Sequence, residues 1–403
     1  MSDTSMTRPS VAGLSLYRGL ERNIYTLFVI RIINRFGDFV QLLLVLILTG
    51  KLNLTPAQAG FFVSLSVVAT MLGQFASGYL ADRWGRKVPL VVCQVMVSFS
   101  YLACAVLFEP FPQLVPYLIL ISSPFRGGTS PLTNTMVADF SRPDHLSKSF
   151  SLLYLGTNIG VALGPVAASF LYVRSIVLLF SFSSLLLFLS TLLLIVAIPK
   201  AGATDKRVSS HSSKTFRMPR ILLLFFFLFS LYSFAYTQNT FTLPLQFTSL
   251  YGDVLGSSRY AMLMTINAVT VLIATAFLTT WTHKLGQFGS MALAMLFFVI
   301  GYGIYAKCRE FPLFLVATCI WTFGEILMAT NANVFVNAYA PPPLRSRCNA
   351  FLTIASSLGR SIAPSAGGLL LAMRGYEQLW SICAGLCFLL GCSYIVLDRY
   401  LKR

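Results

Sequence analysis

The sequence has 403 residues, of which 56% are hydrophobic and 11% are charged, and its formal net charge is +17. Because soluble domains carry about 25% charged residues, this composition excludes an ordinary soluble protein. The positive charge does not indicate a nucleic-acid-binding protein either, since the basic residues lie in short connections between apolar runs. We therefore expect a membrane protein whose basic connections set its orientation and contact anionic lipid headgroups.

The apolar runs have the length of membrane-spanning helices, which need about 20 residues each. A polar and basic segment, residues 1–22, precedes the first run. The sequence predicts an all-α polytopic membrane protein with twelve transmembrane helices. The predicted spans are 23–49, 56–82, 87–109, 112–139, 148–172, 174–198, 220–247, 257–282, 288–306, 312–340, 346–373 and 377–398.

Lysine and arginine are distributed unevenly over the two sides of this topology. With the amino terminus in the cytoplasm, 20 of the 30 basic residues fall on the cytoplasmic side, six on the outer side and four inside spans. Cytoplasmic connections of membrane proteins carry an excess of these residues. We therefore expect a multi-pass protein of the inner (plasma) membrane with both termini in the cytoplasm.

The long basic connection 199–219 separates two sets of six spans that resemble each other. An offset of 199 residues pairs Gly160 with Gly359 and Arg126 with Glu325. Two six-span repeats with a binding site between them are a common transporter plan. The predicted domains are a cytoplasmic segment (1–22), a first six-helix bundle (23–198), a cytoplasmic linker (199–219), a second six-helix bundle (220–398) and a cytoplasmic tail (399–403).

Charged side chains lie near the centres of several predicted spans. Each would cost at least about 2.5–3.5 kcal/mol at a lipid-facing midplane, so they must face protein or water. The five central charges are Arg35, Asp38, Arg126, Glu325 and Arg360. In the first span, spacings of three and four place polar residues on one helical face, namely Arg31, Asn34, Arg35, Asp38 and Gln41.

Two interpretations fit these charges. They form structural ion pairs that hold the bundle together, or they line a water-filled cavity in which Asp38 and Glu325 take up protons and the arginines supply the counter-charge. The five charges sum to +1, which permits an anionic substrate without requiring one. Polar residues in other spans support a cavity as a set, although each alone also fits an interhelical hydrogen bond: Asn158, Tyr236, Gln238, Asn239 and Asn267.

The connection GYLADRWGRKVPL, residues 78–90, concentrates charge between the second and third spans. It matches in full the signature G-x-L-A-D-R-x-G-R-K-x-x-L of the major facilitator superfamily. The chain resembles this family over about residues 20–400 and is most similar to its twelve-span drug:H+ antiporter branch. The resemblance implies two pseudo-symmetric six-helix bundles and a transport function.

Two further segments bear on this resemblance. The antiporter motif of the fifth span, G-x-x-x-G-P-x-x-G-G, is matched at Gly160, Gly164 and Pro165, whereas Ala168 and Ser169 replace its last two glycines. In the fourth span the family has an arginine implicated in proton transfer. Arg126 occupies a suitable place, but the segment that it begins, RGGTSP, departs from the family pattern.

For the charged connection, the resemblance implies a conformational latch. Gly78 would let the second span pack closely against the eleventh, Asp82 would face the amino-terminal end of that helix, and Arg86 would pair with Asp82 and Asp139. Such a latch closes the cytoplasmic side and favours an outward-open state. The alternative is that the basic residues only fix orientation. The latch residues are Gly78, Asp82, Arg83, Gly85, Arg86, Lys87 and Asp139.

The main hypothesis is a secondary active transporter that works by alternating access and exchanges protons for a small amphipathic organic compound, as in multidrug efflux. We expect no cofactor and no metal, with the proton gradient as the energy source. The expected partners are a small-molecule substrate, protons and membrane lipids, with no nucleic acid, and the expected state is a monomer.

Two alternatives stay open. The same arginines could serve an importer or facilitator of a metabolite anion, and the chain could also be a lipid flippase. An enzyme is disfavoured because the three histidines, His145, His211 and His283, lie in connections with no nucleophile or metal ligands around them in the sequence.

Overall fold

A computed structural model describes residues 17–199, 218–341 and 345–401, and these residues form helices and no strands. The first predicted span corresponds to α1 (Arg22–Phe36), α2 (Phe39–Leu42), α3 (Leu44–Leu46) and the π-helix η2 (Ile47–Lys51). The rest of the first half comprises α4 (Pro56–Trp84), α5 (Lys87–Leu107), the 3-10 turn η3 (Pro112–Leu114), α6 (Val115–Phe140), α7 (Leu146–Arg174) and α8 (Ile176–Ala197). The second half comprises α9 (Arg220–Thr282), the 3-10 turn η4 (His283–Leu285), α10 (Gly286–Lys307), α11 (Phe311–Tyr339) and α12 (Arg345–Leu401).

Two of these elements each contain two helices that meet at a glycine. Gly252 in α9 and Gly375 in α12 both have φ of 74° with extended ψ, a conformation that residues with a Cβ atom rarely adopt. Each of the two elements therefore holds two of the predicted spans. Every predicted span overlaps a helix, and the all-α prediction is confirmed, while the number of helices that cross a membrane stays a prediction.

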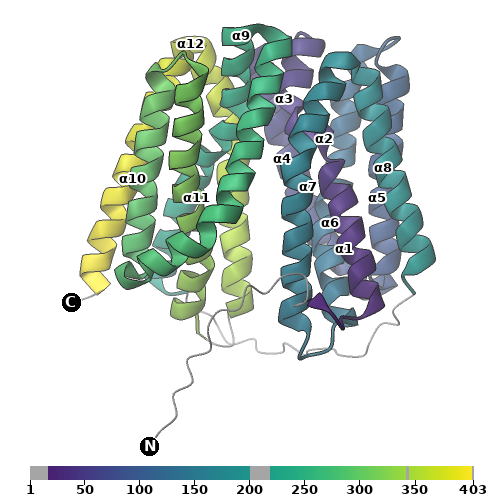
Figure 1. The fold of residues 1–403 in the computed structure, drawn as a ribbon, viewed down its shortest axis with the longest axis horizontal. Coiled ribbons are helices and arrows are strands. Elements are labelled where there is room, and N and C mark those ends of the chain that lie inside the picture. Colours follow the sequence, from purple (N-terminus) through teal and green to yellow (C-terminus); the bar gives the residue numbers. More distant parts are fainter. Residues whose placement is uncertain (1–16, 200–217, 342–344, 402–403) are drawn as a thin grey trace, which may run out of the picture.

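The helices lie side by side as two groups (Figure 1). Helices α1 to α8 form one group, in which α4 packs on α6 and α1 packs on α7, and α9 to α12 form the other. The groups touch through α4 with α12 and through α7 with α9. The predicted linker 199–219 and the segment 1–22 lie largely outside the described residues, so the division at the linker stays a prediction.

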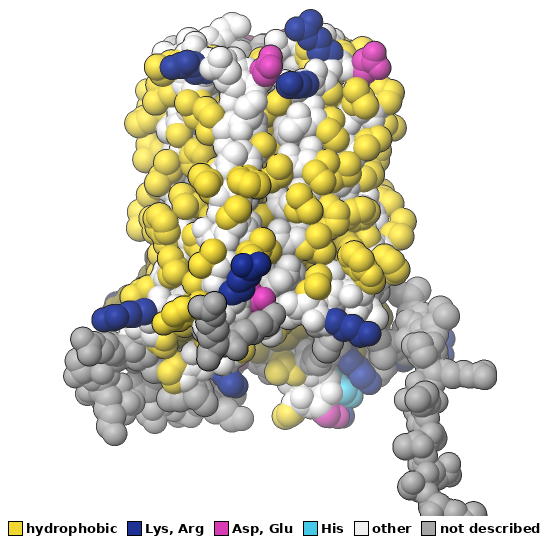
Figure 2. Space-filling model, turned by 90° about the vertical axis from the view of Figure 1, so that its left-hand side faces the viewer, with side chains coloured by type: hydrophobic (Ala, Val, Ile, Leu, Met, Phe, Trp, Pro, Cys, Tyr) yellow, Lys and Arg dark blue, Asp and Glu magenta, His cyan; other side chains and the backbone are white. Residues whose placement is uncertain are grey.

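The surface of the helices is apolar where a soluble protein would be polar. Eight of the described helices are long and apolar enough to cross a membrane. Figure 2 shows hydrophobic side chains across the middle of one face, with charged side chains toward its two ends. Large apolar side chains such as Phe170 and Ile273 are 69% and 75% exposed. Because lipid would cover such a surface, the chain is a polytopic membrane protein.

Candidate functional site

The first predicted span is interrupted near its centre. Helix α1 ends at Phe36, where the Gly37 N–H donates to the carbonyl of Ile33 at 2.8 Å, and Asp38, with ψ of 39°, precedes α2. The sequence predicts one helix over 23–49, and the structure corrects this. Glycine is a weak helix former, and aspartate side chains compete for backbone hydrogen bonds, so the pair Gly37–Asp38 favours a break. Interrupted helices are common at transporter binding sites.

Glycines of α7 allow this helix to approach the end of α1. A Cβ atom on Gly160 would lie 2.6 Å from Cβ of Arg35 and 2.9 Å from the backbone nitrogen of Phe36, so a larger residue does not fit there. A Cβ atom on Gly164 would lie 3.4 Å from the carbonyl oxygen of Phe36. The fifth-span motif therefore positions the segment that carries Arg35 and Asp38.

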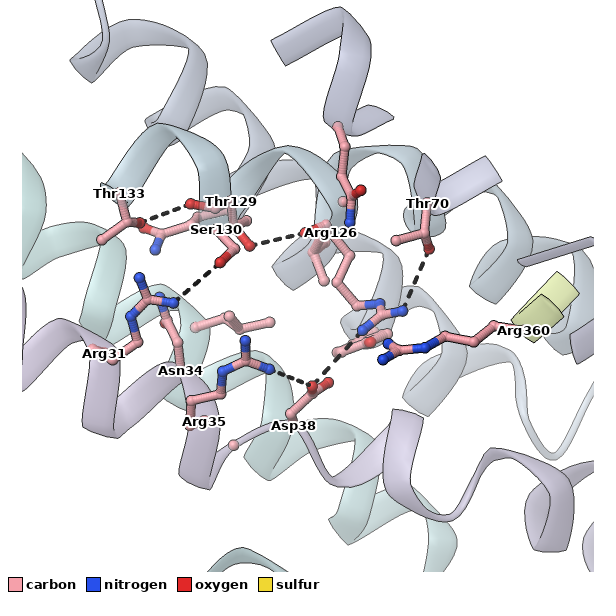
Figure 3. A pocket seen from close by; sticks show the side chains of 17 residues that line it. Arg31, Asn34, Arg35, Asp38, Thr70, Arg126, Thr129, Ser130, Thr133 and Arg360 are labelled. Carbon is pink, nitrogen blue, oxygen red and sulfur yellow. Dashed lines mark hydrogen bonds and ion pairs between the residues drawn. The ribbon is translucent and has the colours of Figure 1, made fainter. Parts of the chain in front are cut away.

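Asp38 lies between two arginines from different helices (Figure 3). Its carboxylate is 3.9 Å from Nη1 of Arg35 and 3.8 Å from Nη1 of Arg126, and Nη2 of Arg126 donates to Oγ1 of Thr70 at 3.4 Å. Both ion pairs are longer than the roughly 2.7–2.9 Å of a charge-assisted hydrogen bond. The guanidinium groups of Arg35 and Arg126 therefore keep N–H donors that Asp38 does not use.

Arg31 lies one helical turn before Arg35 and is held by neutral partners. Its Nη1 donates to Oγ of Ser130 at 3.2 Å and its Nη2 to Oδ1 of Asn134 at 2.5 Å. The residue is 8% exposed. Its charge is fixed against α6 without an acidic partner among the described residues.

Two adjoining cavities surround these side chains. The first has a volume of about 270 Å³ and lies mainly within the first group of helices. The second, of about 330 Å³, lies between the two groups and also contains the predicted site residues Gln41 and Tyr236. Both cavities are lined by Arg35, Asp38, Thr70, Gln74, Arg126 and Arg360, and the first also by Arg31 and Asn34.

A side cavity next to α7 reaches the same aspartate. It measures about 270 Å³, and its lining combines apolar side chains with Asp38 and Gln41. Gly164 and Pro165 of the fifth-span motif form part of its wall. Asp38 therefore lines this side cavity as well as the two central cavities.

Glu325 forms a separate polar cluster in the second group of helices. Its Oε1 accepts a hydrogen bond from the Tyr236 hydroxyl at 2.6 Å, and its Oε2 accepts one from Nδ2 of Asn267 at 2.8 Å. Asn267 also donates to Oγ1 of Thr322 at 2.9 Å. Glu325 lines neither central cavity, but Tyr236 lines the second one and connects the carboxylate with it.

The two polar clusters occupy equivalent places in the two halves. Asp38, Thr70 and Arg126 lie in the first, second and fourth predicted spans. Their counterparts in the seventh, eighth and tenth spans are Tyr236, Asn267 and Glu325, which follow them by 197–199 residues. The glycines repeat as well, since Gly359 approaches the carbonyl of Ser230 in α9 as Gly160 approaches α1. The predicted pairing of Arg126 with Glu325 thus corresponds to a spatial repeat.

Three predicted residues lie elsewhere and line neither central cavity. Gln238 donates to the carbonyl of Ala363 and joins α9 to α12, and Asn239 donates to the hydroxyl of Tyr302. Asn158 donates only to the carbonyl of Tyr154 in its own helix. The two central cavities therefore do not include these three predicted lining residues, because the helices that carry them present other faces to the cavities.

The cavity also contains polar residues that sequence reasoning did not single out. Thr70 and Gln74 lie four residues apart on α4, a spacing that identifies one helical face. The other polar lining residues that were missed include Gln94, Tyr101, Thr129, Ser130, Thr133, Thr237, Thr240 and Ser357. Ordinary hydroxyl residues in apolar helices give little signal, because most of them bond to their own backbone.

In the charged connection, residues 78–90, the predicted ion pair between Arg86 and Asp139 is formed, whereas the predicted close approach of Gly78 to the eleventh span is not. Nε of Arg86 pairs with Oδ2 of Asp139 at 2.7 Å, and Lys87 donates to the carbonyl of Ile195 at 2.8 Å. Asp82 and Arg83 are exposed, and Gly85 turns the chain with φ of 73°. A Cβ atom on Gly78 would meet nothing within 4 Å, so the predicted approach to the eleventh span is not made in this conformation.

The opposite end of α4 packs tightly against α12. A Cβ atom on Gly60 would overlap the carbonyl of Pro364, and Oγ of Ser365 is 2.8 Å from Oγ of Ser64. Between α7 and α9, Oγ of Ser169 donates to Oγ of Ser258 at 3.3 Å. The two groups of helices are therefore joined at the Pro56 end of α4, whereas Gly78 near its other end is uncovered.

Comparisons with known proteins agree with this architecture. The sequence profile described as Major Facilitator Superfamily matches residues 27–364 and 255–402. The chain is 24% identical to the uncharacterized MFS-type transporter YhjO of Bacillus subtilis, over 85% of both chains. It is 23% identical to a Na(+), Li(+), K(+)/H(+) antiporter of Planococcus maritimus, over 76% of this chain and 80% of that protein.

Solved structures share the fold at low sequence identity. The crystal structure of nucleoside transporter NupG superposes with a TM-score of 0.78 at 16% identity and covers 94% of this chain and 100% of that one. A bacterial homologue of the human lysosomal transporter Spinster gives a TM-score of 0.74 at 12% identity, over 94% of this chain and 96% of that one.

Proposed function

Because this chain belongs to the major facilitator superfamily and is therefore a transporter rather than an enzyme, we propose that it is a proton-coupled secondary active transporter of a small organic compound. It works by alternating access, and the proton gradient supplies its energy without a cofactor. Its site is the pair of central cavities lined by Arg35, Asp38, Arg126 and Arg360.

The observation that carries proton coupling is that the polar cluster of each half contains one carboxylate, Asp38 in the first half and Glu325 in the second. Asp38 is paired with arginines, and Glu325 with neutral hydrogen-bond donors, next to cavities at the boundary between the halves. Ionisable side chains inside membrane proteins are costly and rare, and they commonly mark substrate sites or proton paths. Movement of the halves would change the contacts of both groups and hence their occupancy by protons.

Export by antiport is the first direction that we propose. The fifth-span motif at Gly160, Gly164 and Pro165 supports it, as does the similarity to an antiporter. The protein would lie in the inner membrane with both termini in the cytoplasm, as the basic residues predict. In that orientation the joined Pro56 end faces outward, and the structure corresponds to an inward-open state.

The charged connection would then act in the other state. Gly78 and Asp82 lie at the open end of α4 and are free to meet α12 when that end closes. The Arg86–Asp139 ion pair is already formed and would hold the connection in position. We propose that this latch stabilises the outward-open state.

Import of a metabolite anion is a second candidate. The specific observation in its favour is that four arginines and one aspartate line the first central cavity. A symporter and an antiporter respond oppositely when an imposed pH gradient is reversed, so one flux experiment separates the two directions.

Transport in proteoliposomes tests the proposal. We expect uphill movement of a labelled amphipathic compound, either ethidium as a cation or phenylacetate as an anion, in response to a pH gradient. Asp38→Asn and Glu325→Gln should each abolish uphill movement because neither amide can carry the proton. Glu109→Gln, at an exposed carboxylate in the connection after α5, should transport as the parent does. Uphill, proton-dependent transport by both site variants would contradict the proposal.

A further inference from the structure

We propose that the substrate is an amphipathic organic anion whose carboxylate or phosphate group binds between Arg35, Arg126 and Arg360. This inference rests on the proposed transport function and names the chemical class of its substrate. The site is the region shared by the two central cavities, and Figure 3 shows the three arginines and Asp38 around it.

The charge of the cavity is strongly unbalanced. The first central cavity contains four arginines, and Asp38 is its one acidic lining residue. Glu325 lies outside the lining of this cavity, and among the described residues no ion pair joins it to these arginines, since its oxygens accept hydrogen bonds from Tyr236 and Asn267. An uncompensated guanidinium inside a membrane protein is costly, and an anionic ligand removes that cost.

The arginines have donors available for such a ligand. Asp38 lies too far from Arg35 and Arg126, at 3.9 and 3.8 Å, to accept short hydrogen bonds from either. Arg360 is exposed and lines the cavity, and its side chain makes no ion pair or hydrogen bond with another described residue. A guanidinium presents five N–H donors in a planar fork that matches carboxylate and phosphate oxygens.

The arginines come from both halves of the molecule. Arg35 lies on α1 and Arg126 on α6, whereas Arg360 lies on α12 and extends toward them (Figure 3). An anion held by all three would join the two halves across the boundary between them. Binding would therefore favour closure of the cavity around the substrate, which alternating access requires.

The lining of the second cavity also contains apolar side chains. Val63, Val67 and Met71 of α4 line it, together with Leu44 and Phe241. Binding sites are usually apolar with a few polar groups that fix the orientation of the ligand. A ligand with an anionic head and a small apolar body matches this mixed lining, and a volume of about 330 Å³ limits it to a small molecule.

The same electrostatics disfavour a cationic substrate. A cation at Asp38 would lie within a few ångströms of the guanidinium groups of Arg35 and Arg126 as well. The relative from Planococcus maritimus carries metal cations, so the two proteins would differ in the charge of what they bind.

Binding to the full-length transporter in nanodiscs, without any gradient, tests the inference. Ligands that bind the folded state raise its melting temperature. Phenylacetate and phenyl phosphate are the anionic probes, benzylamine and benzyl alcohol are cationic and neutral probes of similar size, and acetate and inorganic phosphate lack the apolar body. Ionic strength is held constant.

We expect stabilisation by phenylacetate or phenyl phosphate, weaker stabilisation by acetate and phosphate, and none by benzylamine. The stronger of the two aromatic anions identifies the preferred head group. Arg360→Gln should weaken its binding more than tenfold, whereas Arg174→Gln, at the end of α7 and outside the central cavities, should bind as the parent does.

Stabilisation by benzylamine but by neither aromatic anion, or an absence of stabilisation by every anion, would overturn the inference. So would unchanged anion binding in Arg360→Gln. The outcome is independent of proton coupling. Anion binding without pH-driven flux would contradict the proposed function alone, and proton-driven transport of a cation would contradict the anion assignment alone.

Discussion

The side chain of Glu21 connects the start of the first helix to a neighbouring segment of the chain. It precedes α1, and its Oε1 forms an ion pair with Nε of Arg142 at 3.4 Å and lies 3.3 Å from Nδ1 of His145. Burial acts to raise the pKa of this carboxyl group, but hydrogen bonds from its own backbone, from His145 and from the backbone of Arg142 outweigh burial, so the pKa is lowered from 4.5. The start of α1 is thereby tied to the residues before α7.

A pH-dependent stability difference follows from this lowered pKa. The stabilisation is complete above pH 4.5 and is lost as the pH falls through the lower pKa of the folded state. Glu21→Gln should reduce the free energy of unfolding by less than about 1 kcal/mol at neutral pH, and the difference should shrink as the pH falls below 4.5. Melting temperatures in detergent at several pH values measure it.

Asp144→Asn is the matched control for Glu21→Gln. The Asp144 side chain is 74% exposed, and its one ion pair among the described residues is to Nε2 of His145 at 3.6 Å, so its loss should have a smaller effect. A Glu21→Gln difference of the same size at neutral and acidic pH would contradict the electrostatic explanation.

At the scale of elements, α4 carries a glycine near each end with opposite surroundings. Gly60 has the carbonyl of Pro364 where a side chain would go, whereas Gly78 has nothing within 4 Å. Close helix approaches in membranes depend on such small residues. The two glycines therefore report on the two ends of the contact between α4 and α12.

Alanine at these two positions should have different effects. Gly60→Ala should push α12 away from the Pro56 end of α4. Spin labels at Leu114, just before α6, and at Leu313, in the first turn of α11, measure this change, and the distance between them should increase by several ångströms. Gly78→Ala should leave that distance unchanged but slow transport, because the added methyl group would obstruct closure of the other end. An unchanged distance in Gly60→Ala, or normal transport by Gly78→Ala, would contradict these two roles.

The interruption of the first span is also an element-scale feature. It separates α1 from α2 at Gly37 and Asp38, and α7 approaches it through Gly160. The equivalent span in the second half, the first part of α9, continues without such a break as far as Gly252. The acidic group of the first half therefore lies on an interrupted helix, whereas that of the second half, Glu325, lies on the continuous helix α11.

At the scale of the whole molecule, the start of α1 and the end of α12 lie at the same end of the bundle (Figure 1). This end also carries the charged connection, and the joined Pro56 end lies opposite it. An even number of crossings explains the arrangement, and the excess of basic residues predicts that this end is cytoplasmic.

Reporter fusions measure this topology. A fluorescent protein that matures only in the cytoplasm should fluoresce at both termini, and a phosphatase that is active only outside should be inactive at both. The same phosphatase inserted after Leu52, in the connection before α4, should be active. Opposite signals at the two termini would contradict an even number of crossings.

The sequence alone determined the class of the molecule, its family and several parts of its site. Apolar runs without enough charge for a water-exposed surface require lipid, and the signature at 78–90 identifies the family. Arg35, Asp38, Arg126 and Arg360 were identified because a charge in an apolar run needs a special environment, and the structure brings all four to the same cavities.

The tertiary structure decided which polar groups face one another. Helical spacing gives the relative direction of side chains within one helix but not the rotation of that helix in a bundle, so Gln238 and Asn239 were expected in a cavity they do not line. The break at Gly37 and the uncovered Gly78 likewise depend on contacts between distant segments and on the conformation of the transporter. Apolar composition is a local property of the chain, whereas the assembly of a site from α1, α4, α6, α9 and α12 depends on packing between them.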